Sequence, residues 1–256
     1  MFQVLPGPIE EILAVLQYWD HIFSGFLLTL WLYGWAIFIG FFLGLILAIL
    51  RQYKLPYRTF PFLGILSNIS AGFIEIVRGT PLIAQLLLIY FLPYSLNLPI
   101  ERWSFSTSFM IFDKEITLIL LNRRTLTGIV VLGLNSSAYQ AEYFRGAIMS
   151  ISSGQLMAAQ SLGMSRFSGI RHIILPQALR RVIPAWSNEA AYLPKYTVIV
   201  YFIGVEELFA EAHWIVSKTF VSLTTYIVIA VIFLVMITLI SKLLDIIHKR
   251  TAIPGL

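Results

Sequence analysis

An uncharged stretch near the N-terminus places the strongest constraint on how this chain folds. No formally charged side chain occurs in residues 22–50, between His21 and Arg51. A helix of roughly 20 apolar residues crosses the hydrocarbon core of a membrane, so this stretch is long enough to cross once. It is also longer than the apolar region of a signal peptide, and no Lys or Arg precedes it. We therefore expect it to remain in the mature protein as a transmembrane helix.

The composition agrees with a protein whose solvent is the bilayer. Of the 256 residues, 58% are hydrophobic and 12% are charged, against about a quarter charged in ordinary soluble domains. We therefore expect an all-α, polytopic bundle of membrane helices that forms one domain over residues 1–256. Cysteine is absent, which excludes disulfides, thiolate nucleophiles and Cys-ligated metal sites.

Five crossings are expected in all. Their approximate ranges are 21–51, 80–97, 125–147, 182–204 and 218–242. The second crossing follows an inner helical segment at 60–78, which Gly79 and Pro81 interrupt. The fourth crossing contains Pro184 and Pro194, and we expect both prolines to break it.

Basic residues predict the orientation of these crossings, because Lys and Arg are enriched in cytoplasmic loops. Three basic clusters mark such loops: Arg51, Lys54 and Arg58; Arg166, Arg171, Arg180 and Arg181; and His248, Lys249 and Arg250. The N-terminus and an external excursion at about 98–124 are therefore expected outside. The C-terminus and a loop at about 150–178 are expected in the cytoplasm. The basic residues lie at the ends of apolar runs and form no single face, which argues against nucleic acid as a partner.

The inner loop at about 150–178 has the pattern of two short helices joined by a tight corner. The serines of SISSG at 150–154 offer N-cap hydroxyls, and Gly163 suits a left-handed C-cap. Ser165 is expected to cap a second helix, which should stop at Pro176. The loop is therefore predicted to be a compact pair of helices at the membrane surface.

So short an element has little core of its own, and its apolar side chains need another surface. We expect Leu156, Ala159 and Leu162 to be buried in this way. Docking of a helix into an apolar groove of a partner is the simplest mode.

The same loop resembles a family motif. The matching positions are Ala158, Ala159, Gly163, Ile173, Leu175 and Pro176. They resemble the EAA loop of the permease subunits of binding-protein-dependent ATP-binding-cassette (ABC) importers, with Met157 where that family usually has Glu. In that family the loop is a coupling helix in a groove of the cytoplasmic ATPase. The resemblance therefore implies that these seven residues form an ATPase-coupling loop.

Other segments extend the resemblance over most of the chain. They are residues 29–51, 73–93, 135–155, 175–189 and 203–208, and they are similar to the polar amino acid permeases of the histidine and glutamine type. The resemblance implies a type I ABC importer permease fold in the bacterial inner membrane. It also implies a polar amino acid as substrate, delivered by an extracytoplasmic solute-binding protein.

The implied partners are a second permease subunit, identical or a sister chain, and two cytoplasmic ABC ATPase subunits. No Gly-Lys dipeptide occurs in the sequence, so a Walker A phosphate loop is absent. ATP and Mg are therefore expected on the ATPase partner, and we expect this chain to be non-catalytic and to hold no cofactor. The four histidines are scattered without a metal-binding spacing, so no metal site is expected.

Two ionisable residues lie within the fourth crossing, Glu189 and Lys195. Such residues are costly in a membrane and usually face a cavity or a partner group. We expect them to contact the solute path, with Lys195 suited to an amino acid carboxylate; the alternative is that Lys195 snorkels or pairs with another helix. Tyr196 and Thr197 are assigned to the same path. The family pattern predicts Asp and Ser at the positions of Tyr196 and Val198, so the amino acid specificity is not carried over.

Several features have two interpretations. Gly40 and Gly44 form a GxxxG pair, which favours close helix packing either between subunits or within one subunit. The pairs Glu75 with Arg78 and Glu142 with Arg145 have the i,i+3 spacing of structural ion pairs, and the alternatives are gating or interface roles. For the whole chain, the rival functions are an ion-driven secondary transporter, and a membrane subunit that docks an ATPase without moving solute.

Overall fold

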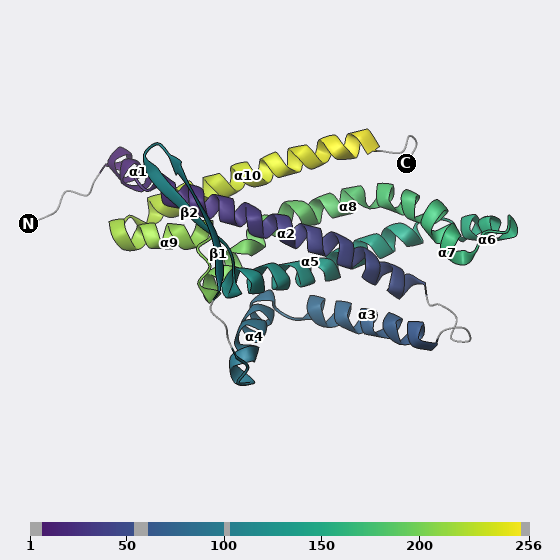
Figure 1. Ribbon diagram of the computed structural model, residues 1–256. Helices are drawn as coiled ribbons and strands as arrows, with labels where there is room; N and C mark the ends of the chain where they lie inside the picture. Colours follow the sequence, from purple (N-terminus) through teal and green to yellow (C-terminus); the bar gives the residue numbers. More distant parts are fainter. Residues whose placement is uncertain (1–6, 54–60, 100–102, 252–256) are drawn as a thin grey trace, which may run out of the picture. The chain divides into compact units, whose positions relative to one another are not determined.

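The computed structural model describes residues 7–53, 61–99 and 103–251, and Figure 1 shows their arrangement into elements. The elements are α1 (Pro8–Leu16), α2 (Trp19–Gln52), α3 (Pro61–Gly79), α4 (Leu82–Ser95), β1 (Ser104–Ile111), β2 (Lys114–Asn122), α5 (Arg123–Met149), α6 (Ser153–Ser161), α7 (Arg166–Gly169), a π-helix (Ile170–Ile174), α8 (Leu175–Tyr196), a 3-10 helix (Thr197–Ile203), α9 (Leu208–Thr219) and α10 (Ser222–Thr251). The chain is mostly helical, as predicted. The basic residues Lys54 and Arg58 lie outside the described residues, as do both chain ends, so the orientation argued from them stays a prediction.

The chain packs as two compact units, each built from three separate stretches. The first unit comprises Met1–Trp35, Leu82–Leu132 and Leu193–Thr238; the second comprises Ala36–Pro81, Gly133–Tyr192 and Leu239–Leu256. The long helices α2, α5, α8 and α10 each contribute residues to both units. The prediction of one domain over residues 1–256 stays a prediction.

The core of the first unit joins α1 and the start of α2 to α9 and α10. Its buried residues are Val15, Ile22, Leu208, Ala212, Ile215 and Ile229. The helix α9 begins at an acidic N-cap, where the Glu207 carboxylate accepts hydrogen bonds from the backbone N–H groups of Phe209 and Ala210, both at 3.0 Å. Such a cap satisfies donors that have no partner within the helix. It therefore fixes the start of α9 against this core.

A β-hairpin in the first unit departs from the all-helical prediction. Strands β1 and β2 are antiparallel and are joined by Phe112 and Asp113, which both have positive φ, as in a type I′ turn. The hairpin is held to α2 by an ion pair of 2.6 Å between Lys114 and Asp20. The Trp31 indole also donates to the carbonyl of Leu120 at 2.9 Å. The external excursion predicted at 98–124 is therefore a folded hairpin over the part that the structure describes.

The core of the second unit is formed by α2, α3, α5 and α8 with the segment before α6. Its buried residues are Leu47, Ala48, Ile74, Ala141, Phe144, Ala147, Ile148, Ile151, Ile174, Ala178 and Val182. The glycine pair of α2 packs against α5 in this unit, because a Cβ at Gly40 would lie 2.3 Å from Gln140 Nε2 and one at Gly44 would lie 2.9 Å from the carbonyl oxygen of Ser137. The GxxxG pair therefore serves helix packing within the chain.

Two of the described helices, α2 and α10, are by themselves long and apolar enough to cross a membrane. The pair α3 and α4 passes the same test only together, and it is bent by 110°. The bend lies at the predicted break between Gly79 and Pro81. The count of five crossings stays a prediction.

The predicted break of the fourth crossing at Pro184 is wrong. Helix α8 continues from Leu175 to Tyr196 through this proline. Pro184 lies on the exposed side of the helix, while Val182 and Leu193 are buried, so packing holds the helix despite one lost backbone hydrogen bond. After Pro194 the chain does change, to the 3-10 helix Thr197–Ile203.

Candidate functional site

The predicted inner loop is a pair of short helices with the expected caps. The Ser152 hydroxyl caps α6, accepting from the Gly154 N–H at 3.3 Å, and the Ser165 hydroxyl caps α7, accepting from the Ser168 N–H at 3.1 Å. Between them Gly163 has a φ of +85°, in the left-handed region that favours glycine. Local sequence signals thus predicted this corner correctly.

The inner side of α6 packs against α7 of the same chain. A Cβ at Gly169 would lie 2.8 Å from Leu156 Cδ1 and 3.5 Å from Ala159 Cβ, so the two helices touch where glycine leaves room. Ala159 is 4% exposed. Ala159 is therefore buried as predicted, and the surface that covers it and Leu156 belongs to the same chain.

Three large apolar side chains of this helix pair and its corner are exposed. Their exposed fractions are 60% for Met157, 86% for Leu162 and 72% for Phe167. Of these three side chains, only Leu162 was predicted from its apolar character to lie on the docking side. Phe167 was missed, because its exposure depends on how α7 turns against α6. The pair thus has a packed inner side and exposed apolar side chains, which helix-in-groove docking needs.

The predicted stop at Pro176 is also wrong. The chain passes from α7 through the π-helix Ile170–Ile174 into α8 without a break, and Pro176 is the second residue of α8. Proline lacks an N–H and its ring crowds the preceding turn. The wider π-turn directly before it accommodates both effects. Ile173, Leu175 and Pro176 therefore connect the loop to a long helix.

Hydrogen bonds connect the base of the loop to α8. Arg181 Nη1 on α8 donates to the carbonyl oxygen of Ser150 at 2.7 Å. Gln177 Nε2 donates to Gln155 Oε1 at 2.5 Å and to the carbonyl oxygen of Ile173 at 2.8 Å. A displacement of α6 is therefore coupled to α8 through direct bonds.

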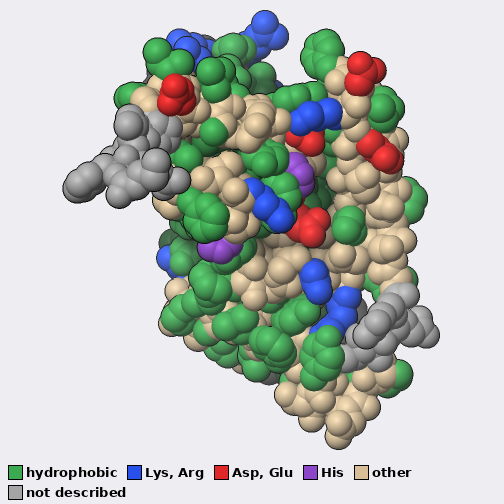
Figure 2. Space-filling view, turned by 90° about the vertical axis from the view of Figure 1, so that its left-hand side faces the viewer, with side chains coloured by type: hydrophobic (Ala, Val, Ile, Leu, Met, Phe, Trp, Pro, Cys, Tyr) green, Lys and Arg blue, Asp and Glu red, His purple; other side chains and the backbone are tan. Residues whose placement is uncertain are grey.

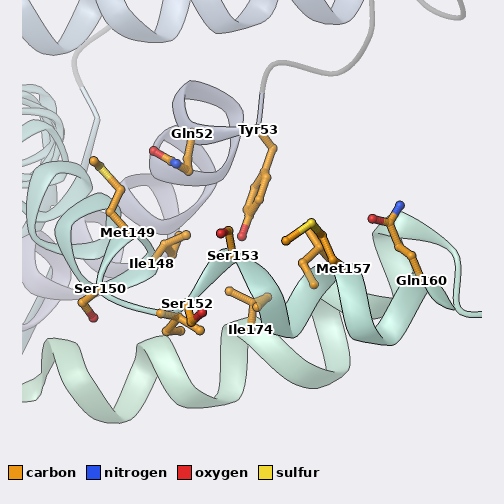
Figure 3. A pocket seen from close by; sticks show the side chains of 12 residues that line it. Gln52, Tyr53, Ile148, Met149, Ser150, Ser152, Ser153, Met157, Gln160 and Ile174 are labelled. Atoms are coloured by element: carbon orange, nitrogen blue, oxygen red, sulfur yellow. The ribbon is translucent and has the colours of Figure 1, made fainter. Parts of the chain in front are cut away.

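A cavity of about 640 Å³ lies beside α6 in the second unit. It is lined by the ends of α2 and α5, by α6 and by Ile174. Figure 3 shows the ring of Tyr53 pointing from the end of α2 toward α6, where Ser153 and Met157 border the same cavity. Arg166 of α7 lies 5.8 Å from the centre of the Tyr53 ring. This cavity therefore lies against α6, next to Met157.

An ion-pair cluster joins α2, α3 and α5 in the second unit. Arg51 pairs with Glu75 at 2.7 Å and with Glu142 at 2.8 Å, and Arg145 pairs with Glu142 at 2.7 Å. The predicted pair of Glu142 with Arg145 is confirmed. The predicted partner of Glu75 is wrong, because its carboxylate reaches Arg51 while Arg78 lies 5.4 Å above the ring of Tyr139.

Glu189 lies at the end of a buried hydrogen-bonded chain in the second unit. Trp186 Nε1 donates to Gln140 Oε1 at 2.8 Å, Gln140 Nε2 donates to Ser136 Oγ at 2.9 Å, and Ser136 Oγ donates to Glu189 Oε1 at 3.1 Å. The Glu189 residue is 5% exposed. Its carboxyl thus accepts a hydrogen bond from α5, and its contact with the solute path stays a prediction.

The other residues assigned to the path belong to the first unit. Lys195 and Tyr196 are exposed. Thr197 is buried, and its hydroxyl donates to the carbonyl oxygen of Pro194 at 2.8 Å. Thr197 therefore has a structural bond at the start of the 3-10 helix, while Lys195 and Tyr196 are accessible.

Comparisons with known proteins agree with this geometry. The family model described as "Binding-protein-dependent transport system inner membrane component" matches residues 40–253. The probable amino-acid permease protein YxeN of Bacillus subtilis (strain 168) is 33% identical over 211 residues, which are 82% of each chain. The glutamine transport system permease protein GlnP of Escherichia coli (strain K12) is 32% identical over 222 residues, which are 86% of this chain and 89% of that one.

A solved structure of an amino acid ABC transporter with histidines matches with a TM-score of 0.76 and 31% identity. The match covers 97% of this chain and 100% of that chain. The predicted fold class is confirmed by this likeness, since the helices of the two chains follow the same course.

Proposed function

Because the chain belongs to the family of binding-protein-dependent transport system inner membrane components, we propose that it forms the translocation path for a polar amino acid. It is a membrane permease subunit of an ABC importer, which works with an ATPase and a solute-binding protein. The proposed substrate class rests on relatives that are named amino-acid and glutamine permeases. Of the four residues assigned to the path, we propose that the exposed Lys195 and Tyr196 contact the solute, while the buried Glu189 and Thr197 support the path from within the packed helices.

The exposed apolar side of α6 and α7 is the observation that carries the proposed coupling to the ATPase. Met157, Leu162 and Phe167 are exposed there, and Ala159 is buried on the inner side. An element whose inner side is already packed keeps its shape when it is pushed, so it transmits a displacement of the ATPase to α8. Among the family-motif positions, we propose contact roles for Met157 and Ala158 and folding roles for Ala159 and Gly163. The remaining positions, Ile173, Leu175 and Pro176, link this element to α8.

Met157 replaces the carboxylate that the family usually has at the first position of the loop. A Met side chain offers no charge for an ion pair, but its flexibility lets it fill an irregular apolar groove. The neighbouring Leu162 and Phe167 extend the apolar surface. We propose that this loop docks mainly through apolar contacts, and that a sister permease with its own Glu is the natural partner for such a loop.

The proposed assembly has two permease subunits, identical or sister chains, with two cytoplasmic ATPase subunits that bind ATP and Mg. The N-terminus and the hairpin β1–β2 face outward in this proposal, while α6, α7 and the C-terminus face the cytoplasm. Single cysteines test the orientation, because the natural chain has none. Ser106→Cys on β1 should react with a membrane-impermeant maleimide in intact cells, and Ser161→Cys on α6 should react only after lysis. The reverse labelling pattern would refute the orientation.

Transport in reconstituted vesicles tests the function. The permease, its ATPase and its binding protein are placed in proteoliposomes, and ATP-driven uptake of labelled L-glutamine and L-histidine is measured. Gly163→Leu should reduce uptake at least ten-fold, because a Cβ strains the left-handed corner. Gly72→Leu is the matched control, since a Cβ there meets no atom within 4 Å. Uptake without ATP would instead support an ion-driven transporter, and ATP turnover without uptake a subunit that only docks an ATPase.

A further inference from the structure

A second cavity, of about 450 Å³, lies within the first unit and is separate from the coupling loop. It is bordered by the starts of α2 and α5, the segment around Gly204 and one side of α9. Seven of its lining side chains carry charge or an aromatic ring: His21, Arg124, Tyr201, Glu206, Glu211, His213 and Trp214. Figure 2 views the molecule from the side on which α1 and α9 are drawn in Figure 1, and it shows acidic, basic and histidine side chains close together on this face. The volume is within the range of roughly 300–1,000 Å³ that is typical of small-molecule sites.

The basic group of this cavity is held in a defined position. Arg124 Nη1 donates to the carbonyl oxygen of Gly204 at 3.1 Å. Gly204 has a φ of +76°, and a Cβ there would lie 3.2 Å from the same Nη1 atom. The glycine therefore allows both the turn and the approach of the guanidinium. A guanidinium has five N–H donors in a planar arrangement. After one bond to a carbonyl oxygen, the remaining N–H groups can still bind a carboxylate.

The opposite charge and the aromatic surface come from the segment before α9 and from α9 itself. Glu206 is exposed and lines the cavity. Glu211 is 8% exposed and pairs with His21 Nδ1 at 2.8 Å, and the His21 ring stacks on Trp214 with 3.9 Å between the ring centres. Lys218 Nζ lies 5.3 Å from the centre of the Trp214 ring, so the surroundings of this ring already suit a cation. Glu211 is engaged by His21, which leaves Glu206 as the acidic group toward an incoming cation.

We propose that this cavity binds a free α-amino acid on the outer side of the permease. Arg124 receives its α-carboxylate, Glu206 its α-ammonium group, and Trp214 with Tyr201 contact its side chain. A zwitterion requires one cation and one anion within the same small cavity, which is what these residues supply. The proposal rests on the proposed transport of amino acids and adds a site that does not include Lys195, Tyr196 or Thr197.

Binding of labelled L-histidine to the purified permease–ATPase complex, without binding protein or ATP, tests the site. All variants carry Lys195→Met in addition, so that binding at the proposed path does not mask the cavity. Arg124→Gln and Glu206→Gln should each raise the dissociation constant at least ten-fold. Glu115→Gln, an exposed carboxylate on β2 away from the lining residues, is the matched control and should bind as the parent does.

Ligand analogues identify which group each residue receives. Histamine lacks the carboxylate, so the parent should bind it at least ten-fold more weakly than L-histidine, and Arg124→Gln should bind the two alike. N-acetyl-L-histidine lacks the ammonium charge, so Glu206→Gln should no longer discriminate against it. If one of the two variants fails to assemble, the other still tests its own half of the zwitterion with the matching analogue.

Three results separate this proposal from its rivals. Unchanged affinity in both variants overturns it. Normal L-histidine affinity with weaker capture of the purified binding protein also overturns it and identifies the cavity as a protein-docking surface. Failure of wild-type proteoliposomes to import any amino acid would overturn the proposed function, whereas normal import with unchanged binding by the variants overturns only the cavity site.

Discussion

In the second unit the ionisable side chains of one cluster neutralise one another across three helices, whereas in the first unit ion pairs stand beside charged side chains that line a cavity. Arg51 joins Glu75 of α3 to Glu142 of α5, and Glu189 ends a buried hydrogen-bonded chain. In the first unit Arg124 and Glu206 border a cavity. Charges with partners on other helices hold those helices together, while charges on a cavity wall are available to a ligand. Substitutions should therefore damage assembly in the second unit and ligand handling in the first.

The largest effect is expected where the buried polar chain meets the glycine pair. Gly40→Leu places a side chain where a single Cβ already lies 2.3 Å from Gln140 Nε2, so α2 and α5 should fail to pack and the purified complex should be lost in gel filtration. Gly34→Leu is the control on the same helix, because its Cβ meets no atom within 4 Å. A normal yield of Gly40→Leu would contradict the close packing of these helices.

Loss of the shared carboxylate in the ion-pair cluster should give the next largest effect. Glu142→Gln removes the carboxylate that accepts hydrogen bonds from both Arg51 and Arg145. Breaking a partly buried ion pair costs roughly 2–4 kcal/mol, which corresponds to a melting temperature lower by about 5–10 °C. Because Glu206 is exposed and lines a cavity, Glu206→Gln should shift the melting temperature by less than about 2 °C. Equal shifts for the two variants would remove the distinction between the units.

Glu189 and Lys195 allow the two roles of charge, structural and ligand-binding, to be compared within one helix, α8. Glu189→Gln keeps an oxygen that accepts from Ser136 and keeps the packing, so uptake should fall by less than about three-fold. Lys195→Met removes an accessible positive charge from the proposed path, and uptake should fall at least ten-fold with basal ATP turnover unchanged. The measurement is ATP-driven uptake in proteoliposomes. The opposite ranking would assign the path role to the buried carboxyl.

A pH dependence of stability should arise from the carboxyl groups at the start of α9. Burial raises the pKa of Glu207 to about 7, although its two backbone hydrogen bonds lower it, and burial also raises the pKa of Glu211. An acid whose folded pKa is raised binds its proton more tightly in the folded state, so stability falls as the pH rises from about 4.5 to about 7. The melting temperature should therefore be lower at pH 8 than at pH 5.

Glu207→Gln isolates this effect, because the amide keeps an acceptor for the cap but does not titrate. The variant should show a smaller decrease in melting temperature between pH 5 and pH 8 than the wild type. Glu115→Gln, an exposed carboxylate on β2, is the control and should keep the wild-type dependence. A dependence that is identical in all three proteins would refute the assignment to α9.

The smallest effect is expected for the loop residue that departs from the family pattern. Met157→Ala shortens one of three exposed apolar side chains while Leu162 and Phe167 remain, so uptake should fall about two- to three-fold. Met157→Glu should stay near the wild-type rate. A severe loss with Met157→Ala would mean that this single side chain dominates docking.

Local sequence signals predicted several helices and turns of this protein. Residues 22–50 predicted one long apolar helix, and α2 is a helix long and apolar enough to cross a membrane. Gly163 and Ser165 predicted the corner of the inner loop, because a left-handed turn and an N-cap depend on neighbouring residues only. The bend near Pro81 was predicted for the same reason. The alternating pattern of residues 104–122 was a local signal for the hairpin, but the length of this segment was interpreted only as an external excursion.

Tertiary packing decided the features that join distant parts of the chain. Arg51 rather than Arg78 neutralises Glu75 because α2 ends beside α3. Ala159 is buried because α7 folds back on α6. Pro184 was accommodated because it lies on the exposed side of a packed helix. The cavity around Arg124 is assembled from four separate stretches of the chain. No local pattern encodes such contacts, since they form only when helices far apart in the sequence meet.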